Sequence, residues 1–250
     1  ARGYRSLAML DMYQGKYSEA IAHLKEAILL NKSVDALQSE YRDRMFLASA
    51  YRVKGRNTDF TSELEAAHRL LSKARFGPDW IMHLAKAYAR MGKTREAAKL
   101  LNDMISQAQN PAAVSGINRS TRADQVAIYI VKGEIALATG KASEAMEAFE
   151  LADRMDPHAL GAESLAFGHL ALGKRRDAAR VYQDILDKFS LGSEGQEYWI
   201  LAHYELGKIY QGLGDTAKAK EYYEKLFAIW KEGDPDIPIL RRARAEYAKL

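Results

Sequence analysis

The chain has 250 residues and a mass of 28.0 kDa, and its 48% hydrophobic and 28% charged residues exclude a disordered chain. It contains no cysteine, which excludes disulfides, thiolate catalysis and cysteine-ligated zinc sites. Its 37 Lys and Arg residues and 33 Asp and Glu residues give a net charge of +4, which by itself does not indicate a nucleic-acid partner. The longest apolar run covers only residues 126–131, so no segment predicts insertion into a membrane.

Six glycines divide the chain at intervals of 33 to 48 residues. Each follows a stretch with helical apolar spacing and precedes another: Gly15, Gly55, Gly92, Gly140, Gly173 and Gly214. A glycine just past a helix can adopt the left-handed conformation that ends the helix without a Cβ clash. The pattern therefore predicts six helical hairpins, each with its turn at one of these glycines.

Small residues lie at fixed distances on both sides of these turns. Seven residues before each glycine stands an alanine or another glycine: Ala8, Ala48, Ala85, Gly133, Ala166 and Gly207. Five residues after the glycine stands an alanine in all hairpins except the second, which has Phe60: Ala20, Ala97, Ala145, Ala178 and Ala219. Small residues on two facing helices let their backbones approach closely, so we expect tightly packed hairpins.

In chain order, we expect the hairpins near residues 1–33, 38–74, 78–109, 122–157, 159–190 and 196–231, within one domain over residues 1–250. Polar segments rich in helix breakers predict loops at 107–116 and 190–195. Asp215 directly follows Gly214 and is predicted to be the N-cap of the last hairpin's second helix.

The tail after Pro235 differs from the six hairpins. Leu240, Ala243, Tyr247 and Leu250 form a single apolar stripe with helical spacing, and arginines occupy most of the remaining surface. We expect an amphipathic helix over residues 238–249 that caps the apolar face of the last hairpin.

These residues resemble the tetratricopeptide repeat (TPR) family. The sixth hairpin carries the motif most fully, as Leu206-Gly207, Tyr210, Gly214, Ala219 and Tyr223. The resemblance implies an all-α, right-handed superhelix of six helix-turn-helix repeats plus the capping helix, and a non-catalytic role in binding proteins. Residues 230–240 and 246–250 are also similar to the tail of TPR arrays in some bacterial multidomain regulators, which carry a serine/threonine kinase or winged-helix domain.

No pattern in the chain indicates catalysis. No two of the six histidines have the i, i+4 spacing of a helical metal site: His23, His68, His83, His158, His169 and His203. The glycines between Gly207 and Gly214 follow no strand and precede no Gly-Lys-Ser/Thr, so they do not predict a phosphate loop. The serines lack a Gly-x-Ser-x-Gly elbow. We therefore predict a protein that is not an enzyme and has no metal and no cofactor.

Candidate ligand-binding residues follow from the first helix of each hairpin, which in TPR arrays lines the concave surface. At about 100° per residue, positions 2, 5, 9 and 12 form a stripe that does not face the second helix, so these side chains are predicted to be available to a ligand. Together with Arg90, the predicted groove residues are Arg5, Met9, Met12, Arg42, Met45, Arg52, Met82, Lys86, Glu134, Phe167, Tyr204 and Lys208. Arginine beside methionine suits a segment with acidic and apolar side chains.

The predicted partner is a peptide, a protein, or another domain of the parent chain. An alternative is a helical repeat that binds single-stranded nucleic acid, because residues 51–100 hold 11 basic and 5 acidic residues. The irregular repeat length and the mixed stripe argue against it. A third interpretation is self-association through the outer face of the first hairpin. The chain begins at Ala1 without a signal peptide, which we interpret as a piece of a longer protein. The cytoplasm is the favoured compartment, and the periplasm is the alternative.

Overall fold

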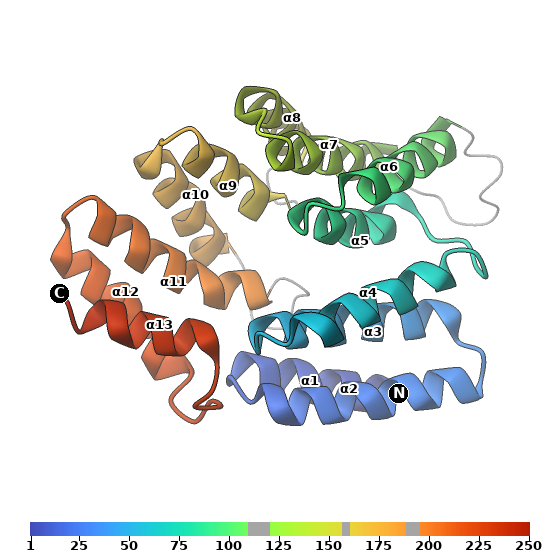
Figure 1. The fold of residues 1–250 in the computed structure, drawn as a ribbon, viewed down its shortest axis with the longest axis horizontal. Coiled ribbons are helices and arrows are strands. Elements are labelled where there is room, and N and C mark those ends of the chain that lie inside the picture. The colour runs from blue at the N-terminus through green and yellow to red at the C-terminus, as the bar shows by residue number, and fades with distance from the viewer. Residues whose placement is uncertain (110–120, 157–160, 189–195) are drawn as a thin grey trace. The chain divides into compact units, whose positions relative to one another are not determined.

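The computed structural model describes residues 1–109, 121–156, 161–188 and 196–250, and within these ranges it contains thirteen α-helices and no strand (Figure 1). The helices are α1 (Arg2–Tyr13), α2 (Tyr17–Ser33), α3 (Leu37–Val53), α4 (Asn57–Leu70), α5 (Pro78–Arg90), α6 (Thr94–Gln109), α7 (Thr121–Ala138), α8 (Ala142–Met155), α9 (Ala162–Ala171), α10 (Arg175–Lys188), α11 (Gln196–Gly212), α12 (Thr216–Ile229) and α13 (Pro238–Tyr247). The all-α prediction is confirmed.

Each predicted hairpin range holds two successive helices, and α13 lies in the range predicted for the capping helix. The loop predicted at 190–195 and most of the one predicted at 107–116 lie outside the described residues, as does His158. The helices group into two compact units, one formed by residues 1–74 and 183–250 and the other by residues 75–182. The description of all six hairpins as one domain stays a prediction. None of the thirteen helices is long and apolar enough to cross a membrane.

The six turn glycines have the conformation that their position after a helix predicted. Their φ angles lie between 71° and 79°, a region that strains other residues. At the first turn, the Gly15 N–H donates to the carbonyl of Met12, and the Lys16 N–H donates to the carbonyl of Asp11 at 2.8 Å. This pair of hydrogen bonds closes the last turn of α1, so that the chain reverses at once into α2.

The close approach of paired helices is also confirmed. A Cβ atom placed on Gly207 would lie 2.7 Å from the Tyr223 ring, and one on Gly133 would overlap the Phe149 ring. Here α11 and α12, and likewise α7 and α8, pack so closely that an aromatic ring occupies the space over a glycine. The N-cap prediction holds as well, since the Asp215 carboxylate accepts from the Lys218 N–H at 3.1 Å.

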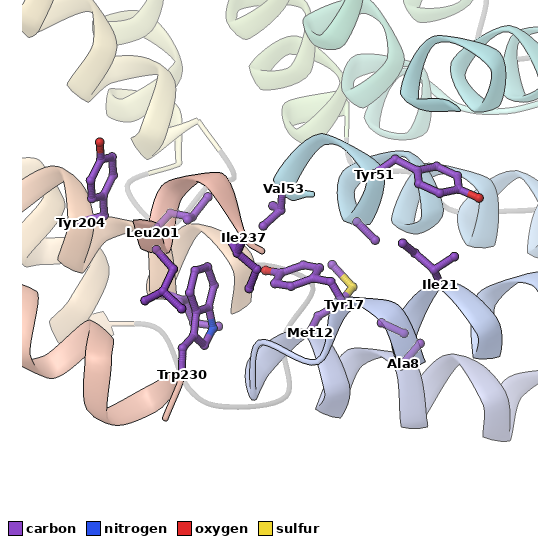
Figure 2. Close-up of a cluster of buried hydrophobic side chains, with 14 of the residues drawn as sticks. Ala8, Met12, Tyr17, Ile21, Tyr51, Val53, Leu201, Tyr204, Trp230 and Ile237 are labelled. Carbon is purple, nitrogen blue, oxygen red and sulfur yellow. The ribbon is translucent and has the colours of Figure 1, made fainter. Parts of the chain in front are cut away.

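In the first unit, the last hairpin and the tail pack against the first hairpin. Figure 2 shows Trp230 beside Tyr17, and their rings form an edge-to-face pair with centroids 5.7 Å apart. Both side chains are fully buried, in one hydrophobic cluster with residues of α1, α2, α3, α11, α12 and α13. A Cβ atom on Gly15 would lie 2.9 Å from the Trp230 indole, so this glycine also makes room for the tail.

Polar contacts also hold the tail against the first two hairpins. The Asp234 N–H donates to the Gly15 carbonyl at 2.9 Å, and the Asp234 carboxylate accepts from the Ser18 N–H at 2.9 Å and from the Lys54 ammonium at 3.0 Å. Burial by itself would lower the pKa of Lys54. The hydrogen bonds from the Lys54 ammonium to Asp236 and Asp234 outweigh burial, so the pKa of Lys54 is raised. The tail therefore joins α2 and α3 as well as covering α12.

The predicted apolar stripe of the tail faces inward. Leu240 and Ala243 are buried in the cluster, and Tyr247 packs edge-to-face on Phe227 of α12 with ring centroids 5.6 Å apart. The Tyr223 hydroxyl donates to the Glu246 carboxylate at 2.9 Å. Helix α13 thus covers the apolar side of α12, as an end cap does.

Candidate functional site

Three helices of the second unit bring charged residues together in one cluster, which we call the α5–α7–α9 cluster. It consists of Lys86 and Arg90 from α5, Glu134 from α7, and Glu163, Ser164 and Phe167 from α9. Three of these, Lys86, Glu134 and Phe167, were predicted groove residues from the sequence stripe, and Arg90 was predicted together with them. Successive first helices of the hairpins lie side by side here, so side chains more than seventy residues apart in the chain meet.

Arg90 is the centre of this cluster. Its guanidinium donates to the Glu134 carboxylate at 2.6 Å and to the Glu163 carboxylate at 2.8 Å. The Lys86 ammonium lies 3.2 Å from Glu163, and the Ser164 hydroxyl donates to Glu134 at 2.5 Å. Two cations therefore face two carboxylates, and the four charges balance.

Burial separates the cluster into a supporting part and an accessible part. Lys86, Glu134 and Glu163 are buried, whereas the Arg90 side chain is 28% exposed. The Arg90 guanidinium lies over the half-buried Phe167 ring, 4.6 Å from its centroid. The buried carboxylates of Glu134 and Glu163 hold the guanidinium plane in position, so Arg90 and the Phe167 ring form one preorganised surface.

His83 lies one turn before Lys86 on α5. Burial, and then the nearby Lys86 ammonium, lower the pKa of His83 to about 4, so its imidazole is neutral at pH 7. In the unfolded chain the pKa of His83 is about 6.5. Between about pH 4 and pH 6.5 the unfolded chain therefore binds more protons than the folded one.

We therefore expect the free energy of unfolding to fall as the pH is lowered from about 6.5 toward 4. A His83→Gln variant should lose less stability over this range, because glutamine cannot take up the proton. Urea unfolding of both proteins across the range measures the difference. Burial also lowers the pKa of His203, which contributes equally to both proteins. Identical pH profiles would show that His83 does not contribute.

In the first unit, Arg5 has a structural role. Its guanidinium pairs with the fully buried Asp43 carboxylate of α3, which also accepts from the Asn31 amide of α2 at 2.6 Å. The expectation that Arg5 is available to a ligand is therefore wrong, because it neutralises a buried charge between the first two hairpins.

Arg52 and Lys208 are exposed but also engaged. Arg52 pairs with Glu197 of α11, which accepts from the Ser49 hydroxyl too. The Lys208 ammonium lies 3.1 Å from Glu205 and 5.1 Å from the centroid of the Tyr204 ring. Burial, and then the Glu246 carboxylate, raise the pKa of the Tyr204 hydroxyl to about 12, so it stays protonated at neutral pH.

The predicted methionines mostly contribute to packing. Met12 and Met82 are buried, and Met9 and Met45 are half-buried, as is Arg42. The structure therefore uses most of the predicted stripe to join neighbouring hairpins. Arg52, Arg90 and Lys208 are the exposed members of the predicted set.

Two acidic partners of the predicted cations were not selected from the sequence: Asp43, which pairs with Arg5, and Glu197, which pairs with Arg52. Asp43 and Glu197 lie near the cations only because helices of different hairpins meet. Opposite charges on the first helices of hairpins that pack together are the signal that could have found them. Within the described ranges, no group of three or more His, Asp or Glu side chains could hold a metal ion.

Paired helices joined by positive-φ glycines, with neighbouring hairpins packed together, define an array of helical repeats. Matches to the tetratricopeptide repeat family cover residues 5–79, 82–159 and 200–229. The chain therefore belongs to the tetratricopeptide repeat family, whose members are generally modules for protein–protein interaction and are typically non-catalytic.

Similar proteins include kinesin light chain-related ones. Protein KINESIN LIGHT CHAIN-RELATED 2 of Arabidopsis thaliana is 24% identical over 251 residues, which cover 93% of this chain but only 37% of that relative. The chain thus spans just over a third of the relative's length. These relatives differ from the bacterial kinase and winged-helix regulators suggested by the tail sequence.

Two crystal structures show the same fold. A Podosopora anserina putative kinesin light chain with nearly identical TPR-like repeats matches with a TM-score of 0.50 and 21% identity, over 70% of this chain and 87% of that one. BtubC (BKLC) from P. vanneervenii matches with a TM-score of 0.50 and 19% identity, over 84% of this chain and 86% of that one.

Proposed function

We propose that this chain is a non-catalytic scaffold, within a larger regulatory protein, that binds a peptide or a segment of a partner protein along the first helices of its hairpins. The proposal extends the general role of the family to a particular surface. The observation that carries it is the Arg90–Phe167 surface, where an accessible guanidinium plane is held over an aromatic ring by two buried carboxylates.

The chemistry of this surface favours a peptide over an oligonucleotide. Several basic residues of the 51–100 window pair with carboxylates of the chain, as Arg52 does with Glu197, Lys54 with Asp234 and Arg90 with Glu134. Nucleic-acid binding depends on cations that neutralise phosphates. A balanced surface with an arginine stacked on a ring instead suits a segment whose apolar or aromatic side chain lies against that pair.

The ligand-binding role of the other accessible positions belongs to the same proposal. Arg52 and Lys208 would offer further contacts in the first unit, while the half-buried Met9, Arg42 and Met45 would offer their exposed atoms.

The test is selection of a displayed random-peptide library on the immobilised chain, followed by titration of the enriched peptides. Phe167→Ala should weaken their binding about tenfold, because a cation–π or ring contact of this size is worth about 1–2 kcal/mol. Arg90→Lys should have a similar effect, because it keeps the charge that Glu134 and Glu163 need and removes the planar group.

Glu147→Ala on the exposed side of α8 is the control and should leave binding unchanged. Far-UV circular dichroism confirms that each variant is folded. Equal weakening by the control variant, or undiminished binding by both site variants, would contradict this surface. Oligonucleotide binding that persists at physiological salt would favour the nucleic-acid alternative.

A further inference from the structure

The outer side of α13 carries a basic surface that neither the fold nor the proposed function uses. Arg241, Arg242 and Arg244 lie on this helix, Lys249 follows it, and all four side chains are exposed. The apolar stripe of the tail is turned to the core of the first unit, so the cations lie on the side of α13 that faces away from that core. We call these four residues the α13 basic face.

The cations of this face differ from many other exposed cations of the chain in having no acidic partner. On other helices a carboxylate three or four residues away often pairs with the cation, as in Lys141–Glu144 and Lys225–Glu221. Within the described residues, no cation of the α13 basic face is in an ion pair. Glu246 is the only acidic residue of α13, and its carboxylate accepts from a tyrosine hydroxyl of α12 instead.

Four like charges therefore lie along about 12 Å of the tail without compensation. They repel one another, and an anion that lies across the face would remove this repulsion. Arginine donates paired N–H groups to a carboxylate or a phosphate, which makes such contacts stronger than those between neutral groups. The face is thus suited to an anionic partner.

The surroundings of the face limit the size of this partner. Glu232 and Asp236 are exposed just before α13, and the Asp236 side chain is 62% exposed although it pairs with Lys54. The hydrogen bond from Lys54 lowers the pKa of Asp236, and the charge of Arg241 acts in the same direction, so acidic residues border the face at the start of the helix. A long nucleic acid or a membrane surface would extend past the cations and meet these carboxylates.

Two further observations argue against those large anions. The apolar stripe of α13 is buried, with Leu240 only 1% exposed, so it has no free apolar side that could enter a membrane. The nearest ring of the helix, Tyr247, packs on Phe227 and donates its hydroxyl to Glu224 at 2.5 Å, so it offers no free face for a base to stack on.

We propose that the α13 basic face binds a short acidic segment of a partner protein, whose Asp or Glu carboxylates accept from the three arginines. This surface belongs to the first unit and carries uncompensated charge. The Arg90–Phe167 surface belongs to the second unit, and its charges balance. The two proposals therefore use different residues, and each can fail without the other.

The test is a titration of a fluorescein-labelled peptide of eight glutamates with the full chain, followed by fluorescence anisotropy at about 0.15 M salt. The wild-type chain should bind this peptide, and the affinity should fall as salt is added. A triple variant, Arg241→Ala with Arg242→Ala and Arg244→Ala, should bind it about tenfold more weakly or worse, because it loses three charge-assisted contacts. Its stability should change little, since all three side chains are exposed.

The matched control removes the same charge elsewhere. Lys174, Arg175 and Arg176 are exposed at the start of α10 and are also without an ion pair among the described residues, and their triple alanine variant should bind octaglutamate as the wild type does. Phe167→Ala should also bind it normally. Circular dichroism confirms that the variants keep their helices.

Three results would overturn the proposal. The first is a wild-type chain that does not bind octaglutamate, and the second is an equal loss of binding in the α10 control or in Phe167→Ala. The third is tighter binding of an oligothymidylate, or of phosphatidylserine-containing vesicles, that depends on the same three arginines, because it would assign the face to a nucleic acid or a membrane.

Discussion

Replacing Trp230 with alanine is expected to lower the free energy of unfolding of the first unit by about 3–5 kcal/mol, the cost of removing a fully buried aromatic side chain. Trp230 is 0% exposed and packs on Tyr17 and against Gly15, between the tail and the first hairpin. Its loss leaves a cavity where the two ends of this unit meet. The remaining polar contacts of Asp234 do not replace this apolar contact.

Urea unfolding followed by far-UV circular dichroism measures the loss in Trp230→Ala. Limited proteolysis should show new cleavage within residues 231–250, because the tail is no longer held on α2. Trp230→Phe should cost much less, since it keeps a ring in the pocket and removes an indole N–H that is buried without a partner among the described residues. Trp80→Ala, at a half-buried tryptophan of the second unit, should leave the tail protected. An unchanged unfolding midpoint in Trp230→Ala would contradict the role of this contact.

The second large effect is expected at Glu134. Replacing this carboxylate with alanine removes one of the two carboxylates that accept from Arg90, and leaves Glu163 facing both Arg90 and Lys86. Breaking a buried ion pair by removing one partner costs about 3–5 kcal/mol, because the other charges stay buried with incomplete compensation. We expect a loss of this size in the free energy of unfolding of the second unit.

Chemical unfolding of Glu134→Ala beside Glu144→Ala tests this expectation. Glu144 lies in an exposed pair with Lys141, so its removal should change stability by no more than about 0.5 kcal/mol. A double variant, Arg90→Leu with Glu134→Leu, should be more stable than the sum of the two single losses indicates, since it removes both charges together. Equal stability of Glu134→Ala and Glu144→Ala would show that the cluster does not stabilise the fold.

Local sequence decided the repeats of this protein. Gly15 and the other turn glycines could be recognised because a positive φ after a helix is a property of one residue and its immediate neighbours. The Asp215 cap and the Leu240–Ala243 stripe are equally local, since each depends on residues within one or two helical turns. The family follows from the same spacing, which is why the repeat pattern and the family match agree.

The tertiary structure decided how the stripe on the first helices is used. The sequence predicted that Arg5 and Lys86 lie on a stripe turned away from the hairpin partner, but it could not show that carboxylates of other hairpins meet that stripe. Asp43 and Glu163 reach them only when helices far apart in the chain pack side by side. A buried cation must be compensated where it lies, so the packing of hairpins, rather than the spacing within one helix, determines which of these residues remain accessible.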